Sequence, residues 1–241
     1  MPPSYRIRTH PRARHVKLRV QPDGALVVTA PPGIGRARVD AIVAERADWI
    51  SQARRRAAAR ADALPAALQG PRPERIELPA VSECWSLSYH QQRGAARSRI
   101  VSDPDAGHLG VHLADDEPDT APVLLCNWLR ARARPVLEAQ VADLAEAFGF
   151  GYGRISIRNQ RSRWGSCSSK GNLSLNARLL FASPAACRYV LVHELVHTRI
   201  PNHSPAFWSA VAELEPDYLE AERELDTLWP RLPGWVDPVR G

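Results

Sequence analysis

The chain has 241 residues, with 32 basic and 26 acidic side chains and a formal net charge of +6. This length allows one large domain or two small ones, and 44% apolar residues with seven Trp exclude an intrinsically disordered chain. No stretch approaches 18 uninterrupted apolar residues and the basic N-terminus lacks an apolar segment, so we expect neither a membrane span nor a secretory signal.

Most of the positive charge lies in the N-terminal third. Residues 1–72 carry 14 basic and 5 acidic side chains, and nearly all of the basic residues are arginine. Clustered arginine can bind phosphate, but such a run is also typical of a solvated helix face, and no aromatic residues interleave with it to stack on bases. The sequence thus allows a nucleic-acid partner without favouring one.

The four cysteines are widely spaced and form no C-x-x-C pair. In a chain without an export signal, this spacing favours free thiols over disulfides. We therefore expect a cytoplasmic protein with four reduced cysteines: Cys84, Cys126, Cys167 and Cys187.

The first half of the chain predicts mostly β-structure. Apolar residues alternate over residues 15–20 and return at 26–28 after Pro22-Asp23-Gly24, which predicts a β-hairpin. Residues 36–60 have a helical apolar pattern. After a proline-rich connector at 65–79, three extended runs predict a small antiparallel sheet: residues 85–89, 97–101 and 109–113.

The second half predicts helices separated by short strands. Residues 122–148 have one long helical pattern, which Pro135 should kink or divide. Two Ser-Pro pairs have the signature of a helix start, with serine at the N-cap and proline in the first turn. The further elements expected are strands at 154–158 and 173–178, helices after Ser183-Pro184 and Ser204-Pro205, and a last helix over 217–229.

The clearest chemical motif is H-E-x-x-H at residues 193–197. On a helix, His193 and His197 project from one face and can present two imidazoles to one metal ion. Glu194 can then reach a metal-bound water without binding the metal, as a general base does. Apolar residues flank the three polar groups, so we expect a buried helix whose polar groups need a partner such as a metal.

A third histidine lies six residues beyond His197. Pro201 and Asn202 should end the helix and turn the chain back, so that His203 can reach the same ion. Three nitrogen ligands with one open position are typical of catalytic zinc.

Other third ligands stay open on these grounds, because many H-E-x-x-H enzymes take a glutamate from a later helix. The candidates are Glu213, Glu215 and Glu220. The longer metzincin pattern is excluded, because Ile200 stands where that pattern needs glycine and Met1 is the only methionine, so that no Met-turn can form.

Residues 158–208 resemble the YgjP-like metallopeptidase family. Its hallmarks R-W-G-S-C, L-N-x-R-L, H-E-L-x-H and P-N-H-S-x-x-F-W occur in order, and the resemblance extends over most of residues 13–229. It implies a zincin-like protein related to SprT-like and WLM proteases, with Zn²⁺ held by His193, His197 and His203 and with Glu194 as the catalytic base.

The predicted fold class is α+β. We expect a mostly β N-terminal module over residues 1–120, with a hairpin, a helix and antiparallel strands. Residues 121–241 are expected to form a zincin-like catalytic domain, a helical metalloprotease core with a small sheet, and the two to pack as one unit.

The R-W-G-S-C segment allows two interpretations. It can be an edge strand on which a peptide lies, with Arg163 and Asn176 as candidate substrate-binding residues, or a tight turn in which Gly165 permits the bend. Cys167 is not expected to be a nucleophile, because no sequence feature favours a lowered thiol pKa. Phe207 and Trp208 are interpreted as core residues of the following helix.

These residues predict a zinc-dependent metallohydrolase, most simply a metallopeptidase acting on peptides or proteins. One alternative is a nucleoside triphosphate pyrophosphohydrolase acting on UTP-like substrates, for which Arg161, Arg163 and Arg178 would suit a polyphosphate. A second is a DNA-associated protease of the SprT or WLM type, with the basic third as its tether. A purely structural zinc domain would leave Glu194 and the open ligand position unexplained.

Overall fold

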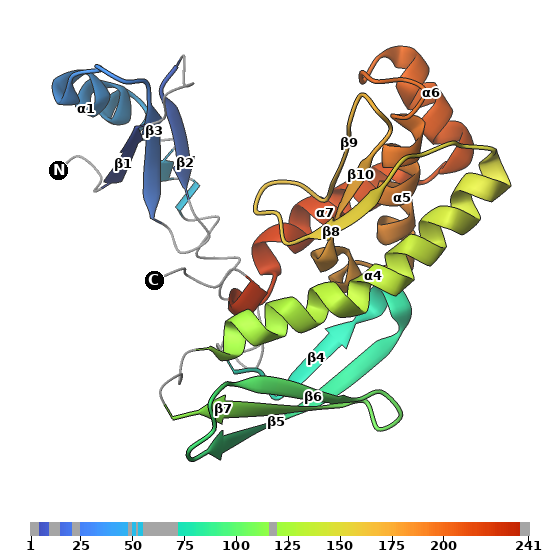
Figure 1. Ribbon diagram of the computed structural model, residues 1–241. Coiled ribbons are helices and arrows are strands. Elements are labelled where there is room, and N and C mark those ends of the chain that lie inside the picture. Colours follow the sequence, from blue (N-terminus) through green and yellow to red (C-terminus); the bar gives the residue numbers. More distant parts are fainter. Residues whose placement is uncertain are drawn as a thin grey trace. The chain divides into compact units, whose positions relative to one another are not determined.

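The computed structural model describes residues 5–9, 15–20, 25–47, 50–51, 53–54, 72–115 and 120–236. The chain forms two compact units, Met1–Pro65 and Ala66–Gly241 (Figure 1). The boundary expected at residue 120 therefore differs from the observed division, and residues 66–120 belong with the C-terminal half. The reason is a sheet within residues 75–114 that shares its hydrophobic core with the helices that follow.

The first unit is a three-stranded sheet with one helix. Its elements are β1 (Tyr5–Thr9), β2 (Lys17–Val20), β3 (Leu26–Ala30) and α1 (Arg36–Glu45). The strand order is β1-β3-β2, in which β2 and β3 pair antiparallel, as the predicted hairpin requires, and the unpredicted β1 pairs parallel with β3. The predicted turn at residues 22–24 lies outside the described residues. Apolar residues of β3 and of the helical segment form a separate small core: Leu26, Val28, Ala30, Val39, Val43 and Ile50.

The second unit begins with a four-stranded mixed sheet. Its strands are β4 (Arg75–Leu78), β5 (Glu83–Gln92), β6 (Arg99–Asp103) and β7 (His108–Ala114), in the order β4-β5-β7-β6. The predicted antiparallel sheet is wrong in one pairing, because β5 and β7 run parallel. β7 is the more apolar strand, with Leu109, Val111 and Leu113 buried, and it occupies the inner position while the exposed β6 takes the edge. β4 occupies the end of the predicted connector.

The long helix α4 (Ala121–Phe148) links the two halves of this unit. Pro135 lies inside the helix and does not divide it. Buried residues continue on both sides of the proline, so packing maintains the helix where one backbone hydrogen bond is lost. Figure 1 shows α4 running between the β4–β7 sheet and the elements that follow it.

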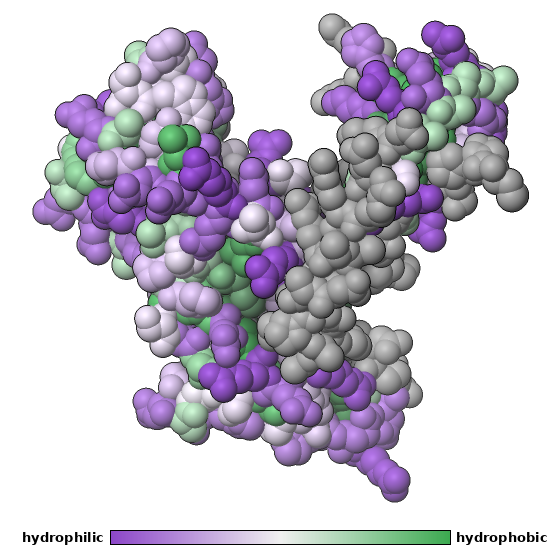
Figure 2. All heavy atoms as spheres, turned by 180° about the vertical axis from the view of Figure 1, so that it is seen from behind, coloured by the Kyte–Doolittle hydropathy of each residue, from purple (hydrophilic) through white to green (hydrophobic). Residues whose placement is uncertain are grey.

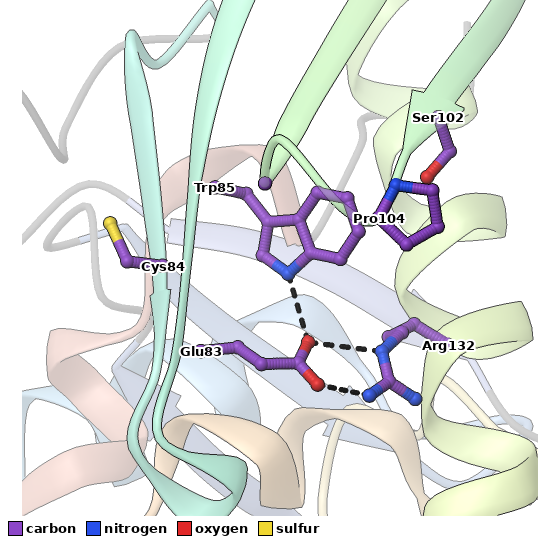
Figure 3. A pocket seen from close by; sticks show the side chains of 7 residues that line it. Glu83, Cys84, Trp85, Ser102, Pro104 and Arg132 are labelled. Carbon is purple, nitrogen blue, oxygen red and sulfur yellow. Dashed lines mark hydrogen bonds and ion pairs between the residues drawn. The ribbon is translucent and has the colours of Figure 1, made fainter.

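An ion pair between Glu83 of β5 and Arg132 of α4 joins the sheet to this helix (Figure 3). The carboxylate of Glu83 accepts hydrogen bonds from the Arg132 guanidinium and from Trp85 Nε1, the latter at 2.9 Å. Burial opposes ionisation of Glu83, but these hydrogen bonds from Arg132 and Trp85 lower its pKa overall. The three side chains line a pocket of about 410 Å³ between the sheet and α4.

The remaining elements form a second small sheet and three helices. The strands are β8 (Ile155–Arg158), β9 (Gly165–Cys167) and β10 (Leu173–Asn176), in the order β8-β10-β9. β10 pairs parallel with β8 and antiparallel with β9, so that β9 is an edge strand. The predicted helices are confirmed as α5 (Pro184–Val196), α6 (Pro205–Leu214) and α7 (Tyr218–Leu228).

The fold class is α+β, as predicted, and short 3₁₀ helices complete it. These cover Pro79–Val81, Ala177–Phe181, Trp229–Arg231 and Gly234–Val236. Within the described ranges, no helix has the length and apolar character needed to cross a membrane. Most of the coloured surface visible in Figure 2 is hydrophilic.

The two Ser-Pro helix starts differ in how the serine is used. Ser183 Oγ accepts a hydrogen bond from Ala186 N at 3.1 Å, and the Ser183 hydroxyl also donates to Glu224 of α7 at 2.6 Å. Ser204 makes no such side-chain cap bond. Only the start of α5, the helix that carries H-E-x-x-H, is therefore fixed by a serine side chain.

We expect Ser183→Ala to lower the free energy of unfolding by about 1–2 kcal/mol, because a capping bond is lost at a partly buried site. Ser204→Ala is the matched control and should change it by less than about 0.5 kcal/mol. Urea unfolding in the presence of a chelator measures both values without a contribution from bound metal. Equal losses in the two variants would contradict the assigned difference.

Candidate active site

The three histidines of the predicted site converge on one point. His193 lies in the last turn of α5, His197 is the C-cap residue of that helix, and His203 directly precedes Ser204, the N-cap residue of α6. The Nε2 atom of His203 lies 3.1 Å from Nε2 of His193 and 3.1 Å from Nε2 of His197. Each residue offers one ligand atom, and these atoms lie within 4.8 Å of one another.

Hydrogen bonds at the far side of the rings orient two of these imidazoles. His197 Nδ1 lies 3.0 Å from the carbonyl oxygen of Ile200. A carbonyl only accepts, so Nδ1 carries the proton and Nε2 keeps its lone pair. His193 Nδ1 lies 3.3 Å from the hydroxyl of Tyr189, one helical turn earlier.

The surroundings favour the neutral forms of His193 and His197. Burial and then the neighbouring imidazoles His197 and His203 lower the pKa of His193 to about 3. Burial likewise lowers the pKa of His197, although its bond to Ile200 acts in the opposite direction. Neutral imidazole is the form that binds metal.

Glu194 follows His193 on α5 and is buried. Its side chain is 5% exposed, and burial raises its pKa to about 7, while the positive charge of Arg163 lowers it. Its Oε2 atom is buried and has no hydrogen-bond partner among the described residues. Three imidazole nitrogens and an unpartnered carboxyl oxygen on the residue after His193 fit a divalent cation that carries a water molecule.

The glycine of R-W-G-S-C lies against this glutamate. A Cβ atom at Gly165 would lie 2.5 Å from Oε1 and 2.7 Å from Cγ of Glu194, a distance that real side chains do not reach. Gly165 is the first residue of β9, so the backbone of the edge strand forms one wall of the Glu194 site. The glycine is required for close approach, and the extended interpretation of this segment is the one observed.

Residues 14–228 match the model of the YgjP-like metallopeptidase domain. The chain belongs to this family. The match covers most of both compact units. It includes the three histidines and the glutamate of the site.

Two solved structures are similar to part of this YgjP-like chain. One is the metallopeptidase zymogen of Pyrococcus abyssi abylysin, with 24% identity, 40% of this chain and 98% of that chain covered, and a TM-score of 0.36. The other is the metallopeptidase zymogen of Methanocaldococcus jannaschii jannalysin, with 21% identity, 38% and 95% coverage, and a TM-score of 0.33. The search of curated proteins found no match. Family membership therefore rests on the match over residues 14–228.

Asn176, predicted from the sequence to bind substrate, lies inside this YgjP-like domain and not at its surface. It is fully buried, and its side-chain amide donates to the carbonyls of Gln160 and Arg163, both at 2.9 Å. Its Oδ1 accepts from the backbone N–H of Arg178. The side chain thus holds the loop before β9 in place and is not presented to a substrate. Arg163 itself is exposed.

The rival glutamates lie outside the histidine cluster. Glu215 forms an ion pair with Arg188 at 2.6 Å, and Glu213 and Glu220 are exposed. In the part of the chain that the structure describes, the cluster suited to a metal consists of His193, His197 and His203.

Phe207 lies in the hydrophobic core and Trp208 packs against it, as predicted, but the sequence did not indicate that both rings also contact the imidazoles. The Phe207 ring is fully buried and stacks on His197 with centroids 4.4 Å apart, and Trp208 stacks on His203 at 5.6 Å. Tyr189 is the further contact of His193. Its spacing of four residues before His193 on a helix was the signal that could have revealed it.

Cys167 and Arg178, two further candidates from the sequence, have surroundings that do not suit a nucleophile or a substrate contact. Burial and then the charge of Glu194 raise the pKa of the Cys167 thiol, which fits the expectation that it is not a nucleophile. Arg178, expected near the cleft, is buried and donates to the carbonyl of Val236 at 2.7 Å.

Gly165→Ala should displace the Glu194 carboxyl group and lower the free energy of unfolding by about 1–3 kcal/mol, because the added methyl group overlaps buried atoms. Gly151→Ala is the control, since a Cβ there meets nothing within 4 Å. Its unfolding free energy should change by less than about 0.5 kcal/mol. Urea unfolding and crystal structures of both variants measure the two effects. An unmoved Glu194 in a fully stable Gly165→Ala protein would contradict the contact.

Proposed function

We propose that the chain is a zinc-dependent peptidase in which His193, His197 and His203 hold the ion and Glu194 is the general base. The observation that carries this proposal is the convergence of one ligand atom from each of the three histidines, all within 4.8 Å of one another, together with the buried and unpartnered Oε2 of Glu194, the residue that follows His193. Membership of a metallopeptidase family supports the same chemistry.

The protein supplies positioning and proton transfer. Zinc, when bound by the three imidazoles, would acidify a water molecule and polarise the scissile carbonyl. Glu194 takes the proton of the attacking water and returns it to the leaving nitrogen. Its contact with Gly165 limits where the carboxyl group can lie, so the base is held in place before substrate arrives.

The edge strand β9 is the proposed binding place for the peptide. Among the described strands it pairs with β10 alone, and its first residue touches Glu194. An extended peptide added to the free edge would gain main-chain hydrogen bonds beside the base. The exposed Arg163, whose charge acts on Glu194, is the proposed contact for an anionic group of the substrate.

The other substrate classes have weaker support. The burial of Arg178 removes one of three arginines that suited a nucleoside triphosphate. A DNA-associated protease depends on the basic N-terminal third, and much of residues 1–72 lies outside the described ranges. The free thiols of Cys84, Cys167 and Cys187 fit a reducing compartment such as the cytoplasm.

Glu194→Gln should keep the metal and lower kcat by about 10²–10⁴-fold, because the general base is lost while the three imidazoles remain. The exposed Glu213→Gln is the control and should keep full activity. Bound metal is measured by elemental analysis, and turnover on an unstructured protein substrate. A Glu194→Gln enzyme with normal kcat would overturn the assigned role.

Hydrolysis of an unstructured protein should occur and should stop when a chelator removes the metal. The test compares that substrate with DNA-bound protein and with nucleoside triphosphates, each with and without chelator. Chelator-sensitive release of pyrophosphate without peptide cleavage would replace the peptidase proposal by the nucleotide one. Cleavage only in the presence of DNA would favour the DNA-associated protease.

A further inference from the structure

One face of the acidic helix α7 is directed toward the metal-binding cluster. Tyr218 and Glu222 are four residues apart on this helix and therefore share a face. The Tyr218 ring stacks on Tyr189 with centroids 6.2 Å apart and on Trp208 at 5.5 Å. Glu222 Oε1 accepts a hydrogen bond from the Tyr189 hydroxyl at 2.8 Å. Both contacts lead, through one intermediate side chain, to a histidine of the cluster.

The direction of the hydrogen bonds at Tyr189 follows from Glu222. A phenol has one proton to donate, and a carboxylate only accepts, so the Tyr189 hydroxyl donates to Glu222. The phenol oxygen is then left as an acceptor for His193 Nδ1, 3.3 Å away. His193 Nδ1 must carry the proton, and its Nε2 keeps the lone pair that faces His203.

This arrangement differs from that at His197 in an informative way. At His197 the backbone carbonyl of Ile200 fixes the tautomer without further help, because a carbonyl cannot donate. A tyrosine hydroxyl can donate or accept. Without Glu222 it could therefore donate to His193 Nδ1, which would place the imidazole proton on Nε2, the atom needed for a metal.

We propose that Glu222 and Tyr189 are positioning residues of the metal centre, which together hold His193 in the tautomer and orientation that bind a metal ion. This inference rests on the proposed function only in taking His193 as a ligand. Carboxylate groups that act on a metal-binding histidine through hydrogen bonds commonly contribute 10–100-fold to metal affinity. The acidic helix thus takes part in the site without supplying a ligand.

The test measures Zn²⁺ affinity by competition with a chromogenic chelator. Tyr189→Phe keeps the ring that stacks on Tyr218 and removes the hydroxyl, and we expect it to weaken Zn²⁺ binding about 10–100-fold. Glu222→Gln should weaken it in the same range, because an amide can donate to the tyrosine and reverse the hydrogen bond. Glu220→Gln, the same change at an exposed position of α7, is the matched control and should bind as the wild type does.

The double variant separates a coupled chain from two independent effects. Once Tyr189→Phe has removed the hydroxyl, Glu222→Gln should have little further effect on Zn²⁺ affinity. Wild-type affinity in both single variants, or effects that simply multiply in the double variant, would overturn the proposal. If the wild-type protein itself bound no Zn²⁺ through the three histidines, the proposed function would fail and not this inference alone.

A second measurement does not depend on the folding of any variant. Nitrogen NMR of ¹⁵N-histidine-labelled wild-type protein without metal distinguishes a protonated Nδ1 from a protonated Nε2. We expect the His193 proton on Nδ1. A His193 proton found on Nε2 would show that Tyr189 donates to the imidazole, and the proposal would be wrong.

Discussion

The burial of Glu194 is the constraint on which the structure around the histidine cluster depends. Glu194 is 5% exposed on a helix whose other buried residues are hydrophobic, and a polar group in such a place needs defined surroundings. One wall is backbone, because any side chain at residue 165 would overlap the carboxyl group. The strand β9 can lie this close to α5 only with glycine at that position, and only if the chain before it keeps one path.

Asn176 fixes that path from inside the protein. Its backbone N–H donates to the carbonyl of Trp164, and its side chain binds the carbonyls of Gln160 and Arg163. The buried amide has partners in the loop for its side-chain N–H groups, and each of these hydrogen bonds also satisfies a loop carbonyl. The order of dependence is therefore Asn176, then the loop before β9, then Gly165, and last the position of the Glu194 carboxyl group.

Local signals in the sequence were sufficient for most elements and for the histidine cluster. The spacing of His193 and His197, the turn at Pro201-Asn202 and the Ser-Pro helix starts each act within one or two helical turns, so that they can be recognised without knowing the fold. Strand order is not local. The parallel pairing of β5 with β7 depends on which of the strands is buried against the core. Strand β4 was missed because the prolines around it indicated a connector.

The errors at the site have the same origin. Strand alternation cannot tell whether Asn176 faces a cleft or the core, since both faces of β10 are largely covered. Glu220 and Glu222 are equivalent in the sequence, and only the packing of α7 against α5 makes one of them contact Tyr189 while the other stays exposed. Residues whose role depends on a contact between distant elements are therefore the ones that sequence reasoning misses.

The proposed ligands are close in sequence, but the groups that orient them are not. His193, His197 and His203 fall within eleven residues, so an unfolded chain could bring them together at small entropic cost. The Tyr189 hydroxyl, in contrast, contacts both His193 and Glu222 of α7, so on the proposal above its role as an acceptor is fixed only once α7 has packed against α5. On the proposed assignment, metal binding and the packing of α7 stabilise each other, because both require the same orientation of His193. The helix α7 would then contribute to the free energy of metal binding, although it supplies none of the three proposed ligands.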